Sequence, residues 1–136
     1  SGSGTRATFE DAVLAGTSAP DDFKPQEQDS SGTAAKMVAN TPGAISYVAF
    51  SYYDDTFKAL KVNGVEPNAE NVENNAWTIW AYEHMYIAAD PDEATKAFID
   101  YMMSDEVQDN LVEQQGYIPV SGMKVEKDAS GKVSSK

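Results

Sequence analysis

The sequence contains no cysteine, few basic residues and no long apolar run. The absence of cysteine excludes disulfides, thiolate metal ligands and cysteine catalysis. No stretch reaches the about 18 consecutive apolar residues that indicate a membrane-spanning helix. The first residues also lack the basic and apolar regions of a signal peptide, so we expect that an exported form has lost that segment. Ten basic residues stand against 22 acidic ones, for a net charge of −12. This charge disfavours nucleic acid as a partner, and any site for a small anion would need strong local donors.

The pattern that remains is that of an α/β domain. With 136 residues, 41% of them hydrophobic, the chain is long enough to form one domain with a core. Apolar spacing and capping residues predict helices at 6–15, 30–40, 68–75, 91–102 and 104–115, the fourth capped by Asp90. Apolar runs predict strands at 44–50 and 77–88, and Asn63-Gly64 predicts a hairpin turn. The polar residues 124–136 predict a flexible tail.

The opening stretch "SGSGTRATFE" is a candidate anion site. Ser3, Gly4 and Thr5 stand where the first helix is expected to begin, and a helix start carries unpaired N–H groups and a positive dipole end. Glycine lets an anion approach the backbone, and the two hydroxyls add donors, so such a site needs no net positive charge. The alternative is a leftover Ser-Gly linker. The stretch is not a P-loop, because the GK[ST] ending is absent.

The other candidate sites favour structural roles. Glu83-His84 holds the only histidine, and without a second ligand a structural role is favoured over a general base or a metal site. Aspartates at 54–55 and at 90 and 92 do not fit a calcium-binding loop, and turns and helix caps explain them better. An aromatic cluster could stack a sugar but favours packing: Trp77, Trp80, Tyr82 and Tyr86. Ser3 lacks the last glycine of a G-x-S-x-G nucleophile motif.

Several segments together resemble one family. "SGSGTRATF", "TPGAISYVAFSYYDD", "FKALKVNGVEP" with "AENVENN", "WAYEHMY" and "AFIDYMMSDEVQDNLVEQQGYIPV" occur in the order seen in phosphate-binding proteins of ABC transporters. These are the PstS-type solute receptors, and the sequence is similar to the lipoprotein form of Gram-positive bacteria. The resemblance covers nearly the whole chain and favours a native loop over a linker, which could then account for Ser1 and Gly2 only.

The resemblance implies a type II periplasmic-binding fold, in which two α/β lobes with a mixed sheet and flanking helices close on phosphate. In that family the loop matching Ser3, Gly4 and Thr5 donates hydrogen bonds to phosphate. The family's arginine four residues before this serine would fall ahead of Ser1, and its other phosphate contacts, a Ser/Thr loop and an aspartate that accepts the anion's proton, come from the first half of the receptor. Arg6 does not match that arginine and is expected to form a salt bridge or a contact on the helix surface.

The chain therefore resembles a C-terminal half, and its division into parts follows from that. Residues 1–76 are expected in the second lobe, 77–90 in the crossover, 91–123 in the return to the first lobe, and 124–136 in the tail.

The resemblance also implies a binding protein without enzyme activity, cofactor or metal. Its expected partners are inorganic phosphate, ABC permease subunits and the missing N-terminal half. Its expected location is the outer face of the cell membrane, through a lipid anchor, or the periplasm. Three alternatives stay open: a half-receptor that acts only as a dimerising interaction module, a receptor for a related oxyanion, and an enzyme that uses Ser3 or His84.

Overall fold

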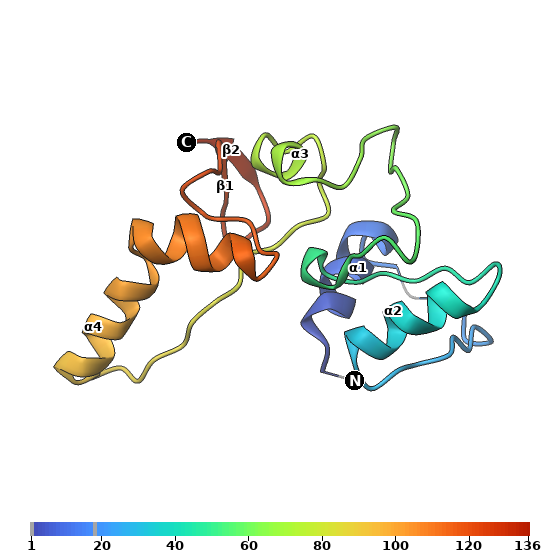
Figure 1. Cartoon of the computed structure of the whole chain (residues 1–136), viewed down its shortest axis with the longest axis horizontal. Coiled ribbons are helices and arrows are strands. Elements are labelled where there is room, and N and C mark those ends of the chain that lie inside the picture. The colour runs from blue at the N-terminus through green and yellow to red at the C-terminus, as the bar shows by residue number, and fades with distance from the viewer. Residues whose placement is uncertain (1, 18) are drawn as a thin grey trace.

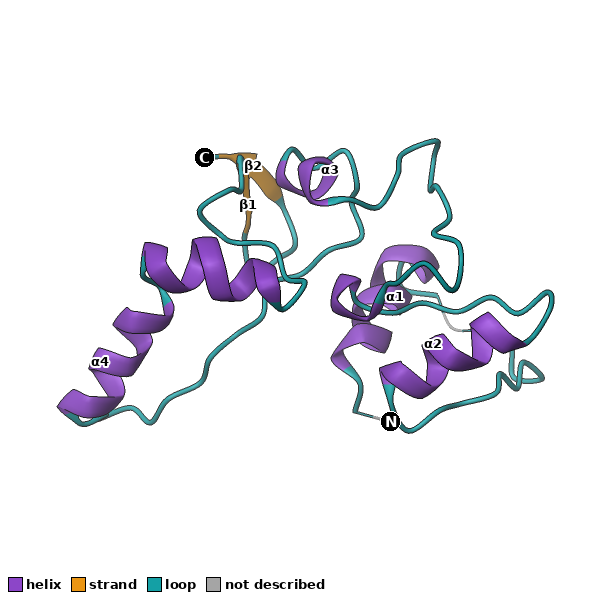
Figure 2. Ribbon diagram, in the orientation of Figure 1, coloured by secondary structure: helices purple, strands orange, loops and turns teal. Residues whose placement is uncertain are grey.

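The computed structural model describes residues 2–17 and 19–136, so Ser1 lies outside the described residues. The elements in chain order are α1 (Gly4–Leu14), α2 (Ser31–Asn40), the 3₁₀ turn η1 (Phe50–Tyr52), α3 (Ala69–Glu73), α4 (Glu93–Met102), the π-helical stretch η2 (Val107–Val112), β1 (Val125–Lys127) and β2 (Val133–Ser135). Figure 1 shows α1 and α2 on one side of the molecule and α3 with the β1–β2 hairpin on the other. Long loops join these parts (Figure 2). In the described part of the chain, no helix has the length and apolarity to cross a bilayer.

The four α-helices of the described residues all begin at a capping side chain. Ser3, Ser30, Asn68 and Asp92 each accept a hydrogen bond from the N–H group three residues further on, which pairs one of the N–H groups that a helix start leaves free. The predicted helices are confirmed, with two corrections. α1 begins at Gly4, before the predicted start at Arg6. Asp92, and not Asp90, caps α4, because its extended backbone places Oδ1 2.7 Å from the N–H of Thr95.

The strands predicted at 44–50 and 77–88 are wrong for this structure. Residues 44–49 and 78–88 form no strand, and residues 50–52 form the η1 turn. An apolar run predicts burial between two layers, but a strand also needs a neighbouring backbone to pair with. The described residues offer these segments no such neighbour, so the strands of the predicted mixed sheet are not formed among them.

Two hairpins are present. Val62 and Val65 exchange hydrogen bonds of 3.0 Å across Asn63-Gly64, whose φ angles of 53° and 80° confirm the predicted turn. The second hairpin lies where the sequence predicts only a polar tail. There β1 and β2 pair antiparallel, with Val125 opposite Ser135 and Lys127 opposite Val133. Asp128 closes the turn by accepting hydrogen bonds from Ser130 and Lys132, and the sequence analysis missed this element.

The core of the described residues is small. Val72 of α3, Trp80 and Met123 form its buried centre, between α3, the segment after it and the β1–β2 hairpin. The accessible surface is 10263 Å², whereas a compact monomer of 14.7 kDa exposes about 6,900 Å². Part of the excess lies on α4, where Phe98 is 57% and Tyr101 46% exposed. The fold therefore presents much apolar surface that the described residues do not cover.

Candidate anion-binding site

The candidate site is the first turn of α1. The Oγ of Ser3 accepts the N–H of Arg6 at 3.2 Å, and its own O–H hydrogen stays available to donate. Gly4 and Thr5 are the first two helical residues, and among residues 2–17 and 19–136 their N–H groups find no acceptor. The hydroxyl of Thr5 likewise has no hydrogen bond to the described residues. Two N–H and two O–H donors are thus available at one helix end, which is the chemistry that an oxyanion requires.

The electrostatics of this turn favour an anion in spite of the total charge. No acidic residue lies in the first turn of α1, in contrast to Glu70 in α3 and Glu93 in α4. The first turn of α1 therefore contributes no carboxylate of its own against the positive end of the dipole, and the nearby carboxylates of Glu10 and Glu27 are paired with Arg6.

Arg6 does not act as a free counter-charge at this turn. Its Nε lies 2.6 Å from Glu10 Oε1, and its Nη1 lies 2.5 Å from Glu27 Oε1. The hydrogen bond to Glu10, followed in size by the one to Glu27, raises the pKa of Arg6. The hydrogen bond from Arg6 in turn lowers the pKa of Glu27. The predicted salt bridge of Arg6 is confirmed. Glu10 could have been named from its position one turn along the helix, whereas nothing in the sequence indicates Glu27.

The site is open on the side that faces away from α1. Ser3 and Gly4 are exposed and Thr5 is half-buried, and a Cβ placed on Gly4 would have no atom within 4 Å. The described residues therefore provide donors on one side of an anion and no opposing wall. By itself this geometry can orient an oxyanion but cannot exclude water from it.

The same tripeptide occurs at the start of α2 and provides an internal comparison. There Ser30 caps the helix, and Ser31, Gly32 and Thr33 form its first turn. The hydroxyl of Thr33 bonds to Ser30 Oγ at 2.9 Å, and its N–H bonds to the same atom at 3.2 Å. The N–H and the hydroxyl of Thr33 are thus both already hydrogen-bonded, unlike those of Thr5. Thr33 stands one residue further from its cap than Thr5, and the same substitution can be made there, away from the candidate site.

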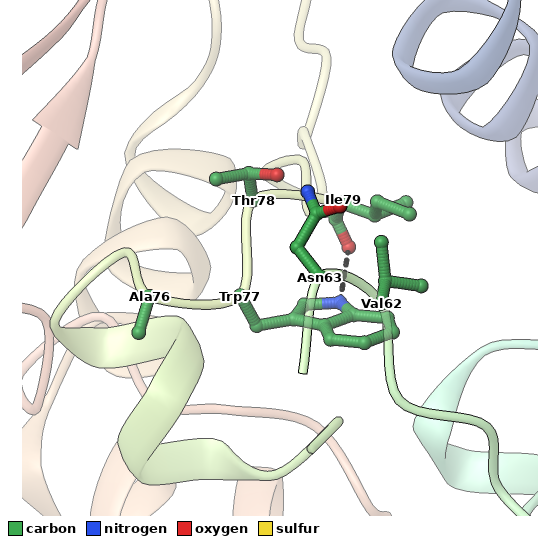
Figure 3. A pocket seen from close by; sticks show the side chains of 6 residues that line it. All are labelled: Val62, Asn63, Ala76, Trp77, Thr78 and Ile79. Carbon is green, nitrogen blue, oxygen red and sulfur yellow. Dashed lines mark hydrogen bonds between the residues drawn. The ribbon is translucent and has the colours of Figure 1, made fainter. Parts of the chain in front are cut away.

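Two cavities lie elsewhere. A cavity of about 40 Å³ lies between the tip of the Val62–Val65 hairpin and Trp77, whose indole N–H bonds to the carbonyl of Ile79 at 3.0 Å (Figure 3). It has room for a water molecule but not for a larger ligand. A groove of about 560 Å³ runs between α2 and η1, with Lys36 and Asp54 among its lining residues. Ser3, Gly4 and Thr5 line neither cavity.

The structure gives the remaining candidates structural surroundings. His84 lies between Tyr82 and Tyr86, with ring centroids 6.4 and 6.2 Å away. Within the described residues, no group of three His, Cys, Asp or Glu side chains could hold a metal ion. Trp80 is buried as predicted, whereas Tyr86 is 89% exposed. Among these aromatic residues, only part of the predicted packing is formed.

Comparison with known proteins identifies the family. A model described as the PBP superfamily domain matches residues 1–106. The chain belongs to the PBP superfamily. This membership confirms the predicted family and its α/β fold class.

The PBP chain is similar to curated phosphate-binding proteins over part of their length. It is 47% identical to phosphate-binding protein PstS of Bacillus subtilis over 133 residues, which are 97% of this chain and 43% of that protein. It is 31% identical to phosphate-binding protein PstS 2 of Streptococcus agalactiae over 77% of this chain and 36% of that protein. Phosphate-binding protein PstS of Borreliella burgdorferi is 29% identical, over 67% of this chain and 34% of that protein. The chain thus spans less than half the length of these relatives.

Proposed function

We propose that this chain is part of the solute-binding component of a phosphate ABC importer and that Ser3, Gly4 and Thr5 hold phosphate. The observation that carries the proposal is the set of N–H and O–H donors at the start of α1 that find no acceptor among the described residues, in a turn that contains no acidic residue. Its support from relatives is the 47% identity to the Bacillus subtilis phosphate-binding protein. In this proposal the protein binds and releases phosphate without any chemical reaction and needs no cofactor.

The chain supplies one side of the proposed phosphate site. A further arginine, a Ser/Thr loop and an aspartate are expected from the remainder of the receptor, which would close over the open side of α1. The isolated chain is therefore expected to bind phosphate weakly or not at all. In the complete receptor the protein works at the outer face of the membrane, lipid-anchored or periplasmic, and delivers phosphate to the permease subunits.

Two substitutions test the proposed donors in a full-length receptor that contains this sequence. Thr5→Val removes one hydroxyl at nearly constant shape, and a lost hydrogen bond to a charged ligand costs about 1.5–3 kcal/mol, or roughly ten- to a hundredfold in affinity. Gly4→Ala adds a methyl group that meets no protein atom within 4 Å. Because alanine favours a helix over glycine by about 1 kcal/mol, this variant should keep or gain stability while losing phosphate affinity.

The matched controls are Thr33→Val and Gly32→Ala, which make the same changes at the start of α2. Isothermal titration calorimetry with phosphate, and with sulfate for the related-oxyanion alternative, measures the affinities. The proposal predicts weaker binding for the α1 variants and unchanged binding for the α2 variants. Equal affinities across all four proteins would remove the α1 turn from the site.

A second candidate function follows from the exposed apolar surface. The accessible area of 10263 Å² exceeds that of a compact monomer by about 3,300 Å², and a standard interface buries about 1,600 Å². The chain has enough uncovered surface to associate with a second copy or with the remainder of a receptor. Size-exclusion chromatography of the isolated chain, with and without phosphate, tests this second function: a dimer under both conditions supports it, and a monomer under both conditions contradicts it.

A further inference from the structure

Asn63, at the tip of the Val62–Val65 hairpin, differs from every other asparagine of the chain in its side chain. Within residues 2–17 and 19–136, the other asparagine side chains each make a hydrogen bond: Asn40, Asn68, Asn71, Asn74, Asn75 and Asn110. The side chain of Asn63 makes none there, and the residue is exposed. Its side-chain amide is therefore free to rotate and open to water.

The residue after Asn63 places an unprotected backbone nitrogen beside this amide. The N–H group of Gly64 finds no acceptor among the described residues, because the hydrogen bonds of the hairpin join Val62 and Val65. Glycine has no side chain to shield its nitrogen, and a Cβ built on Gly64 would meet no atom within 4 Å. In contrast, the next N–H group is already hydrogen-bonded after several other asparagines: Asn40, Asn71, Asn74 and Asn75.

The hairpin holds Asn63 only weakly. Two backbone hydrogen bonds of 3.0 Å close it, together with an ion pair of 2.8 Å between Lys61 and Glu66, whose side chains are 58% and 59% exposed. Exposed ion pairs contribute little stability, and segments with few buried contacts open most easily. Asn63 can therefore leave its left-handed conformation, with φ at 53°, and bring its side chain to the Gly64 nitrogen.

We propose that Asn63 is a site of spontaneous covalent modification, at which the side-chain amide is lost to the neighbouring backbone. Asparagine is among the thermolabile residues. The Gly64 nitrogen attacks Cγ of Asn63, so that a bond forms between these two atoms, the Cγ–Nδ2 bond breaks, and ammonia leaves with the proton of the Gly64 N–H. Water then opens the imide ring, adding its hydroxyl to a ring carbonyl carbon and a proton to the nitrogen. Opening at the backbone carbonyl gives isoaspartate, and opening at Cγ gives aspartate.

The modification changes the charge and the backbone of the hairpin tip. Either acid adds a negative charge beside Trp77, which lines the same cavity as Asn63 (Figure 3). Isoaspartate also lengthens the main chain by a methylene group, because the chain then continues through Cβ and Cγ. The two-residue turn depends on the backbone angles of both its central residues, so isoaspartate should break the pairing of Val62 with Val65. Aspartate should keep it, since Asp-Gly suits the same turn.

Incubation of the chain in warm, mildly alkaline buffer, followed by cleavage after lysine and mass spectrometry, tests the chemistry. The peptide 62–96 carries Asn63 together with the asparagines at 68, 71, 74 and 75, so that their rates are compared within one molecule. An asparagine that must first break its hydrogen bonds should react at least about tenfold more slowly, equivalent to about 1.4 kcal/mol. We expect acid at residue 63 first, with isoaspartate verified by methyl transfer from a protein isoaspartate methyltransferase.

Asn63→Gly is the matched control, because Gly-Gly also suits the turn and carries no side-chain amide. It should gain no acid at residue 63. The proposal is overturned if Asn63 forms no isoaspartate, or if an asparagine with a hydrogen-bonded side chain reacts as fast. None of these measurements involves phosphate, so their outcome is independent of the proposed function.

The indole N–H of Trp77, bonded to the carbonyl of Ile79 at 3.0 Å, reports the structural consequence. Its signal in a ¹H–¹⁵N spectrum, assigned with Trp77→Phe, should shift more in the incubated chain than in freshly prepared Asn63→Asp, which adds the charge without lengthening the backbone. The Trp80 indole, bonded to Asn75, should shift less. Equal Trp77 shifts in the two samples, or the same shift in incubated Asn63→Gly, would show that isoaspartate does not open the hairpin.

Discussion

Gly116→Ala tests how the two parts of the molecule fit together. Gly116 follows η2 with a φ of +76°, and a Cβ built on it would lie 2.7 Å from Ser51 Cα and 3.2 Å from Ser51 Cβ. Ser51 belongs to η1, so the two residues come from segments far apart in the chain. The sequence predicts only that the helix before Gly116 ends at residue 115, whereas the structure places Gly116 where two backbones approach closely.

The expected loss of stability has two parts. A left-handed φ costs a residue with a side chain about 1–2 kcal/mol. The added methyl group also lies well inside the normal carbon–carbon separation of about 3.5–4.0 Å, and such overpacking costs about 1–3 kcal/mol. Because the nearest atom is backbone, no side-chain rotation can relieve the overlap. Gly116→Ala should therefore lower the free energy of unfolding by about 2–5 kcal/mol.

Gly131→Ala separates the two contributions to the loss of stability, the left-handed backbone and the steric overlap. Gly131 has a φ of +83°, but a Cβ there would meet no atom within 4 Å, so it should lose only the backbone component of about 1–2 kcal/mol. Urea unfolding followed by far-UV circular dichroism measures both variants. Equal losses of stability in the two variants would refute the close approach of Gly116 to Ser51.

Two further predictions concern the helix caps. Ser30→Ala removes the acceptor of the Thr33 N–H and should lower the free energy of unfolding by about 1 kcal/mol, measured by urea titration; no change would show that α2 does not depend on this cap. The second prediction concerns Asp92, the cap of α4. Hydrogen bonds from Thr95, the larger effect from its side chain and the smaller from its backbone, lower the pKa of Asp92. The stabilisation by this cap is thus present above the unfolded pKa of about 4 and is lost as the pH falls through the lower folded value. A melting temperature that drops equally with acid in Asp92→Asn and in the original chain would contradict this.

The sequence predicts the local features best. Capping residues start helices by bonding to N–H groups only three residues away, and Asn63-Gly64 forms its turn from its own backbone preferences. The same locality explains the error at α4: Asp90 and Asp92 both suit a cap, and the backbone places Asp92 within reach of Thr95. The start of α1, which carries the candidate site, is local in this sense, and the sequence predicts it two residues too late, at Arg6 instead of Gly4.

Features that depend on distant partners were not predictable. The apolar run at 44–50 indicates burial, but its strand would need a neighbour that the described residues do not supply. The β1–β2 hairpin was missed because its sequence is polar, and the contact of its Lys127 with Trp80 joins residues 47 positions apart. Glu27 was missed for the same reason, since its link to Arg6 spans 21 residues. A sequence pattern predicts which kind of contact a segment requires, and only the fold shows which residue provides that contact.

The total charge of −12 and an anion site at α1 are compatible because they act over different distances. Repulsion from scattered surface carboxylates is screened beyond about 8 Å at physiological ionic strength, whereas hydrogen bonds act at about 2.9 Å and are not screened by salt. Arg6, which could have added attraction, is paired with Glu10 and Glu27. Added salt should therefore weaken the repulsion more than the binding contributed by this turn. A site built from clustered lysines would behave in the opposite way, because salt would weaken the attraction on which it depends.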